Sequence, residues 1–213
     1  RTEGKMVQDK KVYFDLAYIV SCALKQKKPI FDGIDLQSVQ KEAKKDSLLP
    51  LLGTVVPQFR ESFYQNAYRN SNFEKWKKQL YEFFDRNDIL HCSLKGIVVK
   101  DYYPQPMMRF MADYDVLFDP VKKDEVRKWL KENNVDVLYY REIRKGEKED
   151  SVLFNKQFHF ELHYCLLNDE YCEEPWYKYF SNNELYKRLI HVSGAEYRLT
   201  DEDFYLFFLV HAY

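Results

Sequence analysis

The stretch that decides the fold is residues 107–118, MMRFMADYDVLF, where polar and apolar side chains alternate until Asp119 and Pro120 end the segment. Alternation with a two-residue period is typical of a β-strand with one buried face. Asp113 and Asp115 then lie on the same side of that strand. Two carboxylates about 5 Å apart repel by roughly 3 kcal/mol at an effective dielectric near 20 unless a cation offsets their charge. The pattern therefore predicts a cation site, with an ordinary surface or turn-capping role as the alternative.

A second alternating segment, residues 158–166, supplies further polar candidates. Its apolar side chains would fill one face of a strand, while His159, Glu161 and His163 would share the other face. Glu161 thus adds a third carboxylate. Carboxylates with open coordination positions suit Mg²⁺, which also binds substrate phosphates. The H-x-E-x-H spacing also fits zinc, but this alternative is weaker because no further Cys or His lies close in sequence.

Hydrophobic periodicity changes near Asp88. From Val12 to about Arg86, apolar residues recur at intervals of three and four, which predicts amphipathic helices. From Ile89 onward we expect short strands and helices to alternate. The predicted strands are 89–94, 107–118, 135–143 and 158–166, and the predicted helices are 97–103 and 121–132.

The remaining segments complete an α+β prediction. We expect a solvated hairpin tip at 141–150, a loop at 168–174, a short helix at 182–190, a strand at 197–199 and a final helix capped by 200–203. The apolar helical pattern is still running at Tyr213, so we expect a chain trimmed from a longer protein. The predicted regions are a helical N-terminal region at 1–87, a catalytic core at 88–166 with a small mixed sheet, and a C-terminal helical region at 167–213.

Composition and charge exclude several classes of protein. The 46% apolar and 17% aromatic content is too high for a disordered chain. A net charge of −1 gives no global field that would attract polyanions, so nucleic acid is disfavoured as a partner. The longest apolar run, Val12 to Leu24, contains Asp15 and is shorter than the roughly 20 residues that a membrane span needs. Four cysteines without a C-x-x-C pair favour buried, reduced thiols and a cytoplasmic protein: Cys22, Cys92, Cys165 and Cys172.

Four motifs together resemble the uncharacterised nucleotidyltransferase family of bacterial proteins. They are Lys95-Gly96, the Y-P-x-P element at 103–106, R-x-x-x-D-x-D from Arg109 to Asp115, and E-L-H at 161–163. The resemblance covers roughly residues 35–213. It implies a nucleotidyltransferase fold, in which a small mixed sheet carries metal-binding carboxylates and is flanked by helices.

The resemblance also implies a reaction and a set of site residues. The reaction is Mg²⁺-dependent transfer of a nucleoside monophosphate from a nucleoside triphosphate to a hydroxyl acceptor, with release of pyrophosphate. Asp113, Asp115 and Glu161 would hold the metal, or Glu161 would take the acceptor's proton. The expected substrate-binding residues are Lys95, Gly96, Arg109 and His163. The sequence specifies neither the acceptor, which is a small molecule, a protein or tRNA, nor the oligomeric state.

Departures from the family pattern keep alternatives open. The superfamily usually follows its turn glycine with Ser or Gly, whereas Gly96 is followed by Ile97. A non-catalytic module that binds a nucleotide or partner is therefore one alternative, and a metal-dependent phosphoester hydrolase is another. For Arg109, the alternative to substrate binding is a salt bridge that only holds the strand in place. The three methionines of the deciding stretch are expected to pack beneath the active strand rather than to form a nucleobase pocket.

Overall fold

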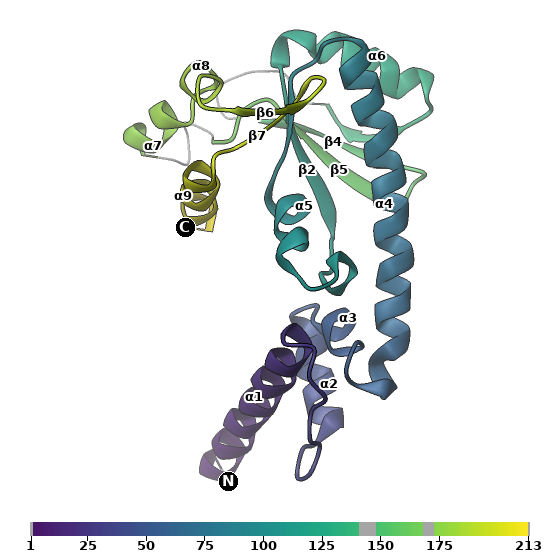
Figure 1. Cartoon of the computed structure of the whole chain (residues 1–213), viewed down its shortest axis with the longest axis vertical. Coiled ribbons are helices and arrows are strands. Elements are labelled where there is room, and N and C mark those ends of the chain that lie inside the picture. The colour runs from purple at the N-terminus through teal and green to yellow at the C-terminus, as the bar shows by residue number, and fades with distance from the viewer. Residues whose placement is uncertain (1, 141–147, 168–172, 213) are drawn as a thin grey trace. The chain divides into compact units, whose positions relative to one another are not determined.

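Two compact units make up the computed structural model, which describes residues 2–140, 148–167 and 173–212. Unit 1 combines residues 1–72 and 99–111, and unit 2 combines residues 73–98 and 112–213. Figure 1 labels the elements of both units. The predicted hairpin tip at 141–150 and loop at 168–174 fall largely outside the described residues, as does Cys172. Where the tip is described, the prediction of a solvated segment is wrong, because Glu149 and Asp150 are buried at the start of a strand.

Unit 1 is helical, as the apolar spacing of three and four residues indicates. The Asp35 side chain caps its second helix by accepting hydrogen bonds from the backbone N–H groups of Gln37 and Ser38. The core contains Ile19, Val39 and Leu52, all with no exposed surface. The elements are α1 (Thr2–Leu24), α2 (Leu36–Lys45), α3 (Leu49–Leu52), the 3₁₀ turns η1 (Pro57–Phe59), η2 (Lys100–Tyr102) and η3 (Pro106–Met108), and the first part of α4 (Arg60–Arg86).

Residues 107–112 do not belong to the strand that the sequence predicted. The strand begins only at Asp113, because side chains of α4 bind the preceding backbone carbonyls in place of a neighbouring strand. Asn66 Nδ2 donates to the carbonyls of Met107, at 2.7 Å, and Arg109, at 2.9 Å. Met108 is buried against Ala23 and Leu51 in unit 1. The expectation that this methionine packs beneath the active strand is therefore wrong.

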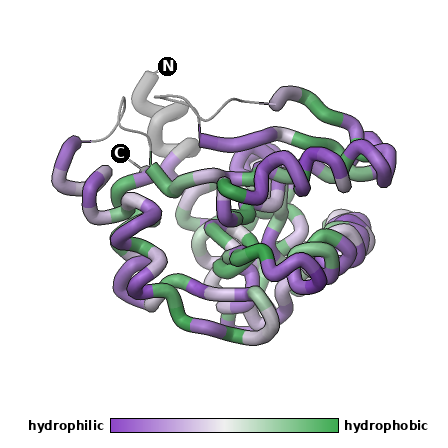
Figure 2. Tube along the Cα trace, turned by 90° about the horizontal axis from the view of Figure 1, so that it is seen from above, coloured by the Kyte–Doolittle hydropathy of each residue, from purple (hydrophilic) through white to green (hydrophobic). Residues whose placement is uncertain are grey.

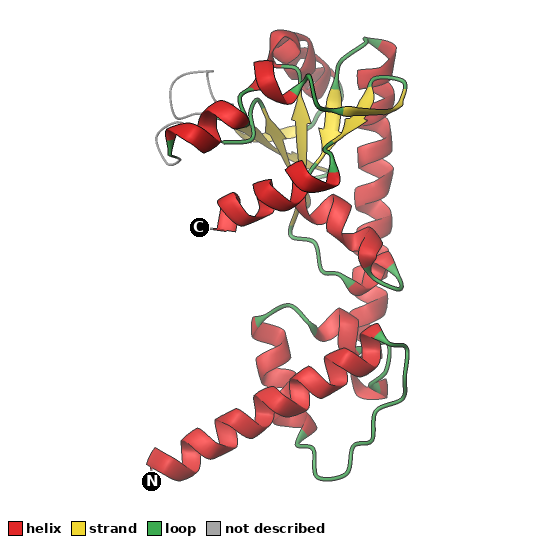
Figure 3. Ribbon diagram, turned by 60° about the vertical axis from the view of Figure 1, so that its left-hand side comes forward, coloured by secondary structure: helices red, strands yellow, loops and turns green. Residues whose placement is uncertain are grey.

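Unit 2 contains a mixed sheet, which confirms the predicted α+β fold (Figure 3). Within the described residues its strands follow the order β3-β4-β5-β2-β1-β7-β6. The pairs β2–β5 and β1–β7 are parallel, and the other pairs are antiparallel. The strands are β1 (His91–Ser93), β2 (Asp113–Phe118), β3 (Asp136–Tyr139), β4 (Glu149–Phe154), β5 (Phe158–His163), β6 (Ile190–Ser193) and β7 (Glu196–Arg198).

Helices flank the sheet of unit 2. They are the second part of α4, α5 (Lys95–Val99), α6 (Lys123–Glu132) with the 3₁₀ turn η4 (Pro120–Lys122) before it, α7 (Glu174–Tyr179), α8 (Asn182–Leu185) and α9 (Asp201–Ala212). The prediction missed β6, whose four residues are all exposed, because an edge strand without a buried face lacks the alternating pattern.

The two faces of β2 carry different chemistry. Tyr114 stacks on Phe73 of α4, with ring centroids 4.4 Å apart, and Phe118 stacks on Phe84 of the same helix. These contacts fix the apolar face against α4. Asp113 and Asp115 therefore lie on the opposite face, as the two-residue period requires.

No helix in the described ranges is both long and apolar enough to cross a membrane. Figure 2 shows hydrophilic and hydrophobic residues interspersed along the chain. Cys22 and Cys92 are buried thiols, whereas Cys165 is partly exposed.

Candidate active site

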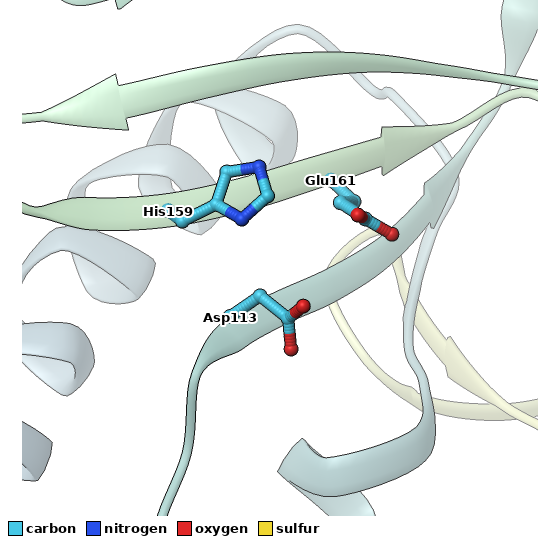
Figure 4. Close-up of side chains that lie close together, drawn as sticks. All are labelled: Asp113, His159 and Glu161. Atoms are coloured by element: carbon cyan, nitrogen blue, oxygen red, sulfur yellow. The ribbon is translucent and has the colours of Figure 1, made fainter.

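The register between β2 and β5 brings the predicted carboxylates together. Asp113 pairs with His159, and Asp115 pairs with Glu161, on neighbouring parallel strands. Figure 4 shows Asp113 on one strand, with His159 and Glu161 on the next, projecting to the same side. Because adjacent strands lie about 4.8 Å apart, side chains at these positions reach one another.

Two overlapping groups of metal-ligating atoms result. One contains Asp113, His159 and Glu161, and the other contains Asp115, Glu161 and His163. Within each group the ligand atoms lie within 4.8 Å of one another. The structure thus brings together four residues that the sequence predicted and adds His159, which the sequence analysis considered only for zinc.

Lys95 enters this cluster from the first position of α5, two residues after β1 ends. Its Nζ lies 2.6 Å from Asp115 Oδ1 and 4.0 Å from Glu161 Oε2. The Leu94 N–H donates to the Asp115 carbonyl at 3.0 Å, which ties the turn to β2. Lys95 has a φ of 43°, in the left-handed region that is costly for a residue with a Cβ. Strained backbone of this kind concentrates at functional sites, where surrounding structure holds it in place.

Asp115 is the most strongly stabilised carboxylate of the cluster. It is 4% exposed, and its Oδ1 accepts hydrogen bonds from both Lys95 Nζ and His163 Nε2, the latter at 2.9 Å. Burial alone would raise its pKa, but the hydrogen bond and charge of His163, with those of Lys95, hold the pKa of Asp115 well below its usual range. Asp115 is therefore an anion at neutral pH.

His163 and Glu161 favour their charged forms for the same reason. Burial opposes a charged imidazole, yet hydrogen bonds to Asp115 and Glu161 outweigh it and raise the pKa of His163. The hydrogen bond from His163 lowers the pKa of Glu161 more than burial raises it. In this half of the cluster the two carboxylates therefore face Lys95 and an imidazole whose charged form is favoured.

Asp113 lies in a different environment two residues away. Burial, followed by the negative charges of Asp115 and Glu161, raises the pKa of Asp113. Among the described residues no hydrogen bond or ion pair forms with its carboxylate, so its charge is not balanced locally. This unbalanced carboxylate makes the oxygen-rich cluster a fitting place for a divalent cation.

The remaining predicted residues have different positions. Gly96 is buried and follows Lys95 at the start of α5. Arg109 belongs to unit 1, where Asn66 and Asn70 donate to its carbonyl, and its buried Nε has no hydrogen-bond partner among the described residues. The salt-bridge alternative for Arg109 therefore finds no support within the described chain, and its binding of substrate stays a prediction.

The sequence analysis also missed Ser151. Its Oγ lies 2.5 Å from His159 Nε2, and it reaches that position because β4 pairs with β5 and places Ser151 opposite Glu161. A single serine in a charged and apolar strand gives no signal without knowledge of this pairing.

Comparisons with known proteins agree with the geometry. The family model described as "Uncharacterised nucleotidyltransferase" matches residues 36–213. No curated protein matches the chain. No solved structure matches it either.

Proposed function

We propose, on the premise that this chain belongs to the uncharacterised nucleotidyltransferase family, that it is an Mg²⁺-dependent enzyme acting on a nucleoside triphosphate. It would transfer the nucleoside monophosphate to a hydroxyl group of a small molecule or a protein and release pyrophosphate. The observation that carries this proposal is the convergence of three carboxylates, Asp113, Asp115 and Glu161, on one face of the sheet.

The carboxylates fit the role of metal ligands. Asp115 and Glu161 have lowered pKa values, so both are anionic at neutral pH without help from a metal. The same property argues against Glu161 as the base for the acceptor, because a base works best with a pKa near the operating pH. Asp113, Asp115 and Glu161 would hold Mg²⁺, which would supply positive charge to offset the charge of the phosphates.

Lys95 is the residue we assign to the triphosphate. It occupies the turn after β1, where the superfamily usually has a phosphate-binding Ser after glycine, and its ammonium already lies at the carboxylate cluster. With metal charge on the carboxylates, Lys95 Nζ would donate to a phosphate oxygen instead. The protein would thus replace a neutral hydroxyl donor with a charged one.

The buried thiols of Cys22 and Cys92 support the further proposal of a reducing, cytoplasmic compartment.

One assay separates the proposed reaction from its alternatives. The chain is incubated with Mg²⁺ and each nucleoside triphosphate, and pyrophosphate and orthophosphate are followed in parallel. Pyrophosphate release that Asp115→Asn abolishes supports transfer. Orthophosphate release supports the hydrolase. Nucleotide binding without release of either supports the non-catalytic module. Asp136→Asn, on the exposed strand β3, is the matched control and should behave like the parent.

A further inference from the structure

We infer that Asp113, Glu161 and His159 form a divalent-cation site of mixed oxygen and nitrogen donors, which binds Mn²⁺ more tightly than Mg²⁺. This inference rests on the metal-dependent site of the proposed function and specifies its preferred ion. The three residues come from facing positions of β2 and β5, and their ligand atoms lie within 4.8 Å of one another (Figure 4).

Ser151 fixes which nitrogen of His159 faces the carboxylates. His159 Nε2 lies 2.5 Å from Ser151 Oγ, and Ser151 is 1% exposed, so the hydroxyl is held by the packed sheet. We assign the tautomer in which Nε2–H donates to Ser151, which leaves the lone pair of Nδ1 for a metal. Histidine ligands in metal sites are oriented in this way by a second hydrogen bond.

Charge balance distinguishes this group from the other overlapping group. Asp115 Oδ1 already has two partners at hydrogen-bond distance, Lys95 Nζ at 2.6 Å and His163 Nε2 at 2.9 Å. Asp113 has no ion pair among the described residues, and it faces a second carboxylate, Glu161, whose own contacts are longer, at 3.5 Å to His163 and 4.0 Å to Lys95. The Asp113 side of the cluster is therefore where added positive charge brings the greatest electrostatic gain.

The nitrogen donor sets the expected preference. Mg²⁺ favours oxygen ligands and keeps its waters, whereas imidazole binds transition-metal ions better. An all-carboxylate site would accept both ions with a small difference in affinity. Adding His159 should favour Mn²⁺, and removing this imidazole should reduce the difference.

The test is calorimetric titration of the chelator-treated full chain with Mn²⁺ and with Mg²⁺, without nucleotide. We expect the parent to bind Mn²⁺ at least about 10-fold more tightly than Mg²⁺, and His159→Asn to lose about 10-fold in Mn²⁺ affinity with little change for Mg²⁺. Ser151→Ala should weaken Mn²⁺ binding in the same direction by releasing the ring. His191→Asn, on the exposed edge strand β6, controls for binding to any histidine.

His159→Asp controls for the possibility that His159→Asn loses Mn²⁺ affinity only because the protein is misfolded. This variant makes the donor set all oxygen, so Mg²⁺ should bind at least as well as to the parent while the preference for Mn²⁺ falls. A Mn²⁺-to-Mg²⁺ affinity ratio that is unchanged in His159→Asn and His159→Asp overturns the inference but leaves the proposed function standing. A parent protein that binds neither ion without nucleotide also overturns the inference, whereas the proposed function fails only if no pyrophosphate is released from any nucleoside triphosphate with Mg²⁺.

Discussion

Asp113 and Asp115 are two residues apart on one strand face, yet the pKa of one carboxylate is raised and that of the other is lowered. Repulsion between neighbouring carboxylates, taken alone, would make Asp115→Asn neutral or stabilising. In the structure, however, the residue that experiences repulsion from neighbouring carboxylates is Asp113, whose pKa is raised. Asp115 is instead hydrogen-bonded to Lys95 and His163. Identical residues thus differ because only one has cationic partners.

Denaturant unfolding at pH 7 in a chelator measures this difference. Asp115→Asn should lower the free energy of unfolding by about 1–3 kcal/mol, because it leaves buried cationic partners without their anion. Asp113→Asn should be neutral or stabilising by about 0.5 kcal/mol. The gain should vanish below about pH 4, where folded and unfolded states both hold the proton on Asp113. Equal destabilisation by the two variants would contradict this assignment.

His91 gives a second prediction at the scale of a residue. Burial lowers its pKa, and the ring lies against Tyr81 and Phe84, with Nε2 buried and without a hydrogen-bond partner in the described part of the chain. The unfolded chain then binds this proton more readily, so stability is full above pH 6.5 and falls as the pH drops through and below that value.

Replacing His91 with Leu should remove this part of the pH dependence. Between pH 7.5 and 5.5 the parent should lose up to about 1 kcal/mol more than His91→Leu. Urea unfolding at the two pH values measures the difference. His191→Asn alters a histidine on an exposed strand and should follow the parent. If His91→Leu and the parent had the same pH dependence, the buried neutral ring would not be its source.

Lys95, the first residue of α5, combines a charged side chain with a strained backbone. Lys95→Met should weaken binding of a non-hydrolysable nucleoside triphosphate by about 10-fold or more, since a charged hydrogen bond to phosphate is lost. Lys95→Gly should lose the same affinity but be about 1 kcal/mol more stable than Lys95→Met, because glycine tolerates the positive φ. Calorimetry and denaturant unfolding measure the two effects separately. Unchanged affinity in both variants would remove Lys95 from the substrate site.

Helix α4 decides where β2 begins, through Asn66. This side chain is 4% exposed and donates to two backbone carbonyls, those of Met107 and Arg109. Asn66→Ala should lower the free energy of unfolding by about 2 kcal/mol, because the Met107 carbonyl loses its side-chain donor and the Arg109 carbonyl keeps only the longer hydrogen bond from Asn70. Asn72→Ala is the matched control, since Asn72 donates to the Tyr68 carbonyl within the same helix and should change stability far less. Equal effects of the two substitutions would show that Asn66 does not hold this segment.

Local periodicity explains how much of the molecule could be predicted. The helices of the first 87 residues, and the shared face of Asp113 and Asp115, follow from spacing within one element. The contact of Ser151 with His159 depends on the pairing of β4 with β5, which no local pattern encodes. The late start of β2 depends on Asn66, about 40 residues earlier in the chain. Prediction therefore failed where a distant side chain or strand determines the local structure.

At the scale of the whole molecule, the net charge of −1 is the sum of two units with net charges of opposite sign. Unit 1 contains 14 Lys and Arg against 9 Asp and Glu, a net of +5, and unit 2 contains 19 against 25, a net of −6. The neutral average describes neither unit. The excess of negative charge in unit 2 favours a cation site, because a negative field raises the local concentration of cations.

The interleaved path of the chain has a consequence for its synthesis. Unit 1 is completed by residues 99–111, which bring Met108 to the surface formed by Ala23 and Leu51. A nascent chain that has extended only to residue 98 lacks that segment, although all the helices α1 to α4 have been made. Domains usually fold in order of emergence from the ribosome. Unit 1 can therefore complete its fold only after residues 99–111 have been synthesised. During that interval its apolar surface is open to chaperones and proteases.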